Sequence, residues 1–179
     1  DRGWQEAARD ELFALIDRRK KLPVDALRAL AWFADSRADA RLIAELHNGS
    51  PEDVYRILAR LPRFAEPLDR AVREMWAERP RFYQPHSGHE ALIYLAIRHG
   101  IPEAVRETVR VLRLYNREQH AFDFRALMLL GEMVELPGIT SRDRVDQNKI
   151  RAAALALGDS DFDFDPVFRR YRPLKGADQ

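Results

Sequence analysis

The sequence predicts an all-α protein of about eight or nine helices, arranged as antiparallel pairs and followed by an extended C-terminal tail. Apolar residues recur every three or four positions through nearly every segment, which is the period of a helix with one buried face. No segment combines a sustained alternation of period two with the turn residues that a β-hairpin needs. The helix pairs are expected either to stack as an irregular α-solenoid or to close into a compact bundle.

The first helix is expected over residues 3–20. Its apolar positions recur at steps of three and four and fall on one stripe: Trp4, Ala8, Leu12, Leu15 and Ile16. Pro23 then opens a second helix. Capping boxes mark three later helix starts, each with a serine and an acid three residues further on. They are Ser36 with Asp39, Ser50 with Asp53, and Ser87 with Glu90.

The best internal boundary is residues 79–88, which hold two prolines and a glycine and no helical stripe. Beyond it, helices are expected near 89–99, 103–116, 120–135 and 141–157. We therefore expect a single helical domain over 1–158, with a sub-boundary at 79–88, and an extended tail over 159–179. Four aromatic side chains fall on amphipathic helices and are expected in the core: Trp32, Phe33, Trp76 and Tyr94.

Residues 89–105, HEALIYLAIRHGIPEAV, are typical of a helix, a left-handed turn at Gly100 and a second helix opened by Pro102. The expected anchors of this pair are Leu92, Ile93, Ala96 and Val105. LAIRHGIPEAV is similar in spacing to the inner helix, glycine turn and outer helix of an ankyrin repeat, over about one unit. ALIY replaces the family's usual threonine-proline-leucine-histidine start. The resemblance implies ankyrin- or HEAT-like stacking, and the compact bundle stays an equal alternative.

The charges nearly cancel, with 30 basic against 29 acidic residues and a net charge of +1. This balance gives no global electrostatic drive toward nucleic acid. The absence of cysteine excludes disulfides and thiolate ligands, but it leaves localisation open, with the cytoplasm favoured and a removed leader still allowed. No apolar run approaches the roughly 20 residues of a membrane span. We expect no cofactor, and the oligomeric state stays open.

One candidate contact element is the loop FYQPHSGHE, with Phe82, Tyr83, His86 and His89. Two imidazoles beside Glu90 suit zinc or iron in kind. Their spacing does not, because His86 precedes the expected serine cap and His89 follows it, so the two do not share a helical face. We therefore expect a surface contact loop and no metal site.

The tail begins with DSDFDFD, which alternates aspartates with Phe162 and Phe164. A calcium loop counted from Asp159 would need glycine and glutamate where Phe164 and Arg170 stand, so that interpretation fails. The alternation instead predicts an extended segment with its phenylalanines in an apolar groove and its acids in water. Phe168 is expected to be a further aromatic anchor on the helical body.

The next residues form a mixed basic and aromatic cluster: Arg169, Arg170, Tyr171 and Arg172. Such a cluster suits a phosphate backbone with a base stacked on the aromatic ring. Because the whole chain is electrostatically balanced, ion pairs with the preceding aspartates or with acidic helix faces are favoured over nucleic acid.

The favoured function is a non-enzymatic interaction or adaptor module, whose stacked helix pairs present the 79–88 loop and the tail to a protein partner. No catalytic constellation is recognisable among the motifs. The alternative is a helical hydrolase or nuclease, acting through a metal held by His86 and His89 or through an arginine and histidine pair.

Two such pairs, Arg41 with His47 and Arg113 with His120, resemble in spacing the motif of HEPN ribonucleases. That resemblance implies a helical ribonuclease whose site contains an arginine and a histidine. The polar residue that usually follows the arginine in that family is a leucine at both places.

Overall fold

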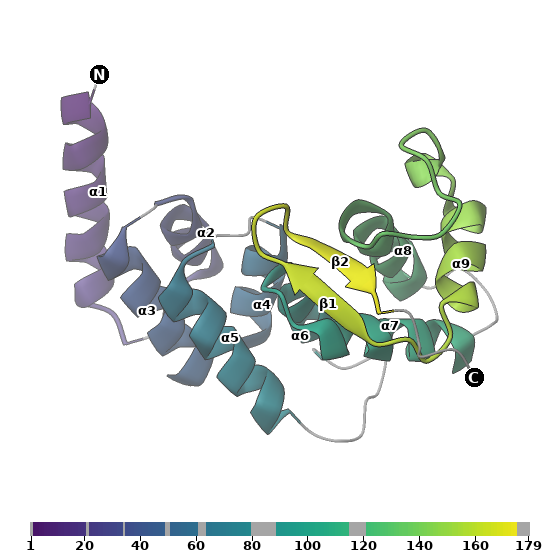
Figure 1. The fold of residues 1–179 in the computed structure, drawn as a ribbon. Coiled ribbons are helices and arrows are strands. Elements are labelled where there is room, and N and C mark those ends of the chain that lie inside the picture. The colour runs from purple at the N-terminus through teal and green to yellow at the C-terminus, as the bar shows by residue number, and fades with distance from the viewer. Residues whose placement is uncertain are drawn as a thin grey trace. The chain divides into compact units, whose positions relative to one another are not determined.

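The computed structural model describes residues 2–20, 22–33, 35–48, 51–60, 64–79, 89–114 and 121–174. In these ranges the chain forms nine α-helices, one short 3-10 helix and two strands (Figure 1). The prediction of a mostly helical fold with a short C-terminal tail is confirmed. No helix in the described part of the chain is long and apolar enough to cross a bilayer.

The described residues divide into two compact units, residues 1–71 and 72–179. The first contains α1 (Arg2–Asp17), α2 (Val24–Trp32), α3 (Ser36–Asn48), α4 (Pro51–Arg60) and the start of α5 (Glu66–Glu78). The second contains the rest of α5, then α6 (His89–Arg98), α7 (Pro102–Leu114), α8 (Ala121–Met133), the 3-10 helix η1 (Asp143–Val145), α9 (Gln147–Ala156), β1 (Phe162–Asp165) and β2 (Arg170–Pro173). The expected sub-boundary at 79–88 falls almost wholly outside the described residues.

In the first unit, α2, α3 and α4 pack on one another around a leucine-rich core. On α1 the buried side chains are Phe13 and Ile16. The predicted stripe was therefore wrong in part, because Trp4 is 74% exposed and Leu15 is exposed as well. Trp32, expected in the core, also lies at the surface. A helix with apolar residues on several faces buries only the face that finds a neighbour, and the sequence does not say which one does.

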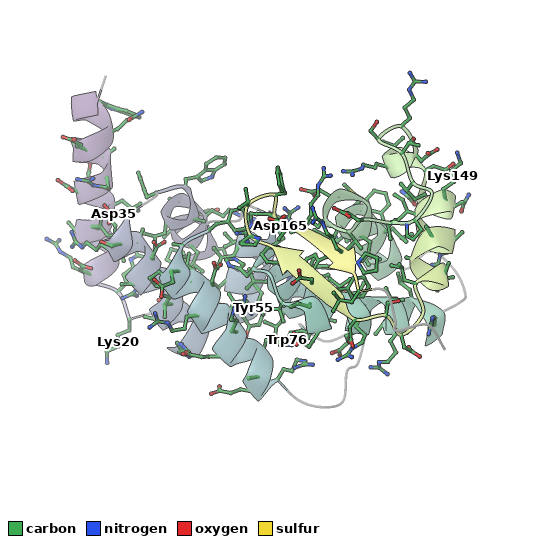
Figure 2. All side chains as sticks on the ribbon, in the orientation of Figure 1. Lys20, Asp35, Tyr55, Trp76, Lys149 and Asp165 are labelled. Atoms are coloured by element: carbon green, nitrogen blue, oxygen red, sulfur yellow. The ribbon has the colours of Figure 1, made fainter. Side chains whose placement is uncertain are left out.

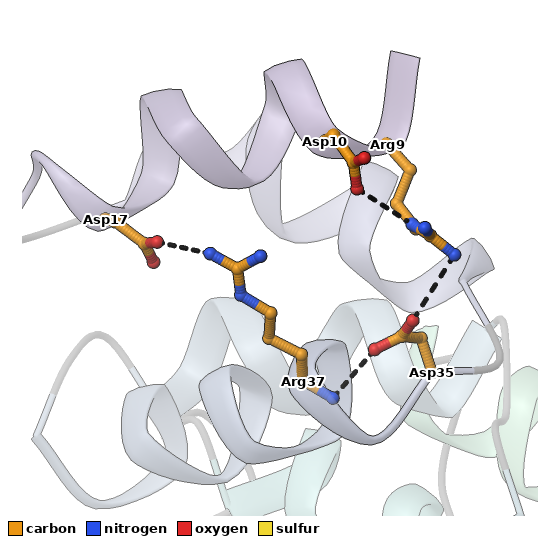
Figure 3. Close-up of polar contacts among 5 residues, drawn as sticks. All are labelled: Arg9, Asp10, Asp17, Asp35 and Arg37. Carbon is orange, nitrogen blue, oxygen red and sulfur yellow. Dashed lines mark hydrogen bonds and ion pairs between the residues drawn. The ribbon is translucent and has the colours of Figure 1, made fainter. Parts of the chain in front are cut away.

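Ion pairs join α1 to the start of α3 (Figure 3). The Arg37 guanidinium contacts Asp17 at 2.5 Å and lies 4.4 Å from the Phe13 ring centroid. Asp35 accepts a hydrogen bond from the Arg37 amide at 2.8 Å, so it caps α3. The predicted cap, Ser36, is instead the first residue of that helix. Both residues have short oxygen-bearing side chains, and the backbone of the preceding turn decides which one reaches the free amides.

In the second unit, α6 packs on α7 and α8, and α9 packs on α7 and α8. The four predicted anchors of the α6–α7 pair are buried: Leu92, Ile93, Ala96 and Val105. Trp76 and Tyr94 are buried as predicted. Gly100 ends α6 with a φ of +76°, which confirms the left-handed turn. The helix–glycine–helix unit is therefore present, whereas a repeated stack of such units stays a prediction.

The helix expected over 141–157 begins later than predicted. Residues Asp143–Val145 form the 3-10 helix, and α9 starts at Gln147. Asp146 caps α9, because its side chain accepts hydrogen bonds from the Asn148 and Lys149 amides. Hydrogen bonds from Lys149 and Thr140 hold the pKa of Asp143 well below its usual range, so this carboxylate ties the preceding loop to α9.

The tail is extended as predicted, but it folds back on itself as a β-hairpin, which the sequence patterns did not predict. β1 and β2 are antiparallel, with Phe162 opposite Pro173 and Asp165 opposite Arg170. The Glu135 amide donates to the Tyr171 carbonyl at 2.8 Å, so the chain leaving α8 lines the second edge of the hairpin. The alternation in the first strand predicted an extended segment, but the second strand has only four residues and was interpreted as a basic and aromatic cluster, so the pairing of the two was not predicted.

Candidate functional site on the C-terminal hairpin

The predicted binding residues fall into two groups. Phe82, Tyr83 and His86 lie outside the described residues, and His89 opens α6 with a side chain that is not described. The predicted contact loop therefore stays a prediction. The other group, residues 169–172, lies at the start of β2 and is fully described.

Tyr171 is fully buried beneath the hairpin. Its hydroxyl donates a hydrogen bond to the Ile97 carbonyl, and its ring centroid lies 4.8 Å from that of Phe164. Burial raises the pKa of this hydroxyl far above its usual value. The expectation that the tail aromatics anchor it to the helical body is therefore confirmed for Tyr171, which leaves no exposed ring to stack on a base.

Arg169 has a φ of +50°, an uncommon conformation for a residue with a side chain. Its guanidinium donates to the Arg98 carbonyl and lies 5.5 Å from the Phe164 ring centroid. Arg73 donates to the Gly100 carbonyl at 3.0 Å. With the Tyr171 hydroxyl, these side chains bind carbonyls at the C-terminal end of α6, which a helix leaves without internal partners. The hairpin therefore caps α6.

Several other charged groups of the tail form ion pairs within the second unit. Arg172 contacts Glu135 at 3.0 Å. Asp161 contacts Arg106 at 2.6 Å and Asp159 contacts Arg113 at 3.1 Å, so the acidic part of the tail runs along the basic face of α7. The expected pairing of a tail arginine with a preceding aspartate is present, because Arg172 contacts Asp165 at 3.7 Å, whereas the pairing of tail aspartates with arginines of α7 was not predicted.

The HEPN-like pairs do not form a described site. Arg113 contacts Asp159, and the position of His120 is outside the described residues. Arg41 donates to Glu45 at 2.9 Å. His47 lies six residues beyond Arg41 on the same helix, which places the two about 120° apart around its axis.

The turn of the hairpin presents two apolar side chains that sequence reasoning placed wrongly or overlooked. Val167 is 82% exposed and Phe168 is 68% exposed, so Phe168 is not the predicted anchor. The carboxylate of Asp165 accepts hydrogen bonds from the amides of both residues, at 2.9 and 3.1 Å. Asp165 is marked on the hairpin in Figure 2. The signal in the sequence was Asp165 followed by Pro166, a common turn opening.

This apolar tip is the most distinctive exposed feature of the tail. Among the described residues, no group of three histidines or acids lies close enough to hold a metal ion. Comparison with family models, curated proteins and solved structures gives no match to this chain. The chemistry of the described surface therefore carries the functional argument alone.

Proposed function

We propose that this protein is a non-enzymatic interaction module, in which a scaffold of helix pairs holds the hairpin tip for an apolar pocket on a protein partner. The observation that carries the proposal is the exposure of Val167 and Phe168 on a turn whose backbone is fixed by Asp165. Large apolar side chains that are both exposed and ordered are typical of binding sites.

Fixing the tip before binding favours association, because less conformational freedom is lost when the partner docks. Two side chains anchor the hairpin to the second unit. Tyr171 is buried and donates to the Ile97 carbonyl, and Arg169 donates to the Arg98 carbonyl at the end of α6. An aromatic side chain on such a support is the usual form of an energetic hot spot. Arg170 and Arg172 on the adjoining strand would form a polar rim, which suits an acidic margin around the partner's pocket.

The test is photo-crosslinking from position 168 with a benzophenone amino acid, using the full chain in a lysate of its source cells. We expect one dominant crosslinked protein, and we expect Phe168→Asp to reduce its capture by the purified chain at least tenfold. The melting temperature should not change, since the side chain is exposed.

Trp4→Asp is the matched control, because Trp4 is a similarly exposed aromatic on α1, a helix of the first unit. Its capture should equal that of the wild type. Equal losses in both variants, or no crosslink from position 168, would contradict the proposal.

A further inference from the structure

Helix α8 is apolar on two opposite faces. One face supplies the core of the second unit with Ala126, Leu127, Leu130 and Met133. On the other face Phe124 is 51% exposed and Met128 is 55% exposed. About half of each of these two side chains is thus exposed, and an apolar helix face of this kind is normally covered by a neighbour.

Two charged side chains, Arg125 and Glu132, lie beside this apolar face. On a regular helix, Phe124 lies about 40° to one side of Met128, while Arg125 and Glu132 lie about 60° and 40° to the other. All four side chains therefore share one stripe along α8. Within this stripe the apolar pair lies on one side and the two opposite charges lie on the other, with Arg125 before Met128 and Glu132 after it.

We propose that this face binds a second copy of the same chain, with the two α8 helices antiparallel about a twofold axis close to Met128. Such an axis exchanges positions at equal distances before and after it. Arg125 lies three residues before Met128 and Glu132 lies four after it, on the same side of the helix. The Arg125 side chain would therefore meet Glu132 of the partner subunit, and the contact would occur twice.

The structure supports both charged positions. Among the described residues Arg125 has no ion-pair partner within the chain, so it is available to a second copy. Glu132 is held by the Arg98 guanidinium at 3.0 Å, yet its side chain is 58% exposed. The carboxylate is thus oriented by one arginine and open to another. If the partner were a protein of unrelated sequence, nothing would require Arg125 and Glu132 to lie at nearly equal distances on either side of Met128.

The 3-10 helix enlarges the same surface. It packs on α8, and the Arg144 carbonyl lies 3.4 Å from the position that a Cβ on Gly131 would take. The next residue, Val145, is among the most exposed large apolar side chains in the described ranges. On a regular helix Gly131 lies about 60° from Met128 on the Phe124 side, so the 3-10 helix lies nearer the apolar side of the stripe than the charged side.

The experiment is sedimentation velocity of the full chain over a range of concentrations, with variants that reverse the charges. We expect a reversible dimer. Arg125→Glu and Glu132→Arg should each weaken dimerisation at least tenfold, since each places like charges opposite one another. The double variant should restore most of the affinity, because both pairs reform with their signs exchanged. Arg110→Glu, an equal charge change on α7, is the control and should have no effect.

Several outcomes would overturn the proposal: a monomer at every concentration, equal effects of Arg125→Glu and Arg110→Glu, or a double variant as weak as the single ones. If Glu132→Arg disturbs folding through loss of the Arg98 contact, Met128→Asp replaces it and should abolish the dimer. Phe168→Asp should leave the dimer unchanged, so this inference and the proposed function fail independently.

Discussion

Gly100 is the residue on which the joint between α6, α7 and the hairpin depends. Its positive φ places it in a conformation that side chains disfavour, and a Cβ there would lie 2.5 Å from the Phe164 ring. The sequence indicated the first reason for glycine, through its position at the end of a helix. The second reason, the hairpin ring lying against the turn, depends on residues 64 positions away and was not visible in the sequence.

Gly100→Ala should therefore cost more stability than backbone strain alone. Strain of this kind contributes about 1 kcal/mol, and the contact with Phe164 adds about 1–3 kcal/mol of overpacking. The measurement is the free energy of unfolding from urea titration. Gly138→Ala is the matched control, because Gly138 has a φ of +73° and open space around its Cβ position. Equal costs in the two variants would show that Phe164 moves away freely.

The hairpin is the element that most changes the interpretation of the chain. In the sequence it is a polarised tail with several aromatics, a pattern compatible either with a permanent part of the core or with an internal occupant that a partner displaces. The burial of Phe162 and Tyr171 and the capping of α6 favour the permanent role. The outward position of Phe168 gives the same element a contact surface. The buried side chains of the hairpin thus stabilise the fold, while its turn carries the proposed contact surface.

Deleting residues 159–179 tests the role of the element. We expect a loss of at least about 3 kcal/mol in the unfolding of the second unit, because two buried aromatics leave the core. Capture of the partner should disappear with it. Deleting only residues 175–179 is the control and should change neither property. Intact folding with stronger capture would instead support a displaceable occupant.

At the scale of the whole molecule, composition excludes some classes of function but does not select one. Zero cysteines exclude thiolate chemistry, and a net charge of +1 gives no general attraction to polyanions. Ion pairs engage several of the arginines in the described ranges, among them Arg106, Arg113 and Arg172. Arg172, which the nucleic-acid interpretation would use, is thus already paired. The metal-dependent alternative rests on His86 and on His89, the first residue of α6, and stays a prediction.

Metal analysis separates these two classes. We expect the purified chain to contain far less than one zinc, iron or manganese ion per molecule, and chelator to leave its melting temperature unchanged. The double variant His86→Ala, His89→Ala should have the same metal content as the wild type. A stoichiometric metal that this variant loses would favour the hydrolase alternative over the interaction module.

The sequence by itself determined the helical class, the positions of most helices and the left-handed turn at Gly100, because period, capping and glycine conformation are local properties. It also determined that Phe162 faces inward while Asp163 faces water, since alternation along a strand is local as well. The tertiary structure decided which of several apolar faces is buried, and so exposed Trp4 while burying Phe13. It alone decided that the tail folds back as a hairpin that caps α6 and directs Phe168 outward. Those contacts join segments far apart in the chain, and no local sequence pattern encodes them.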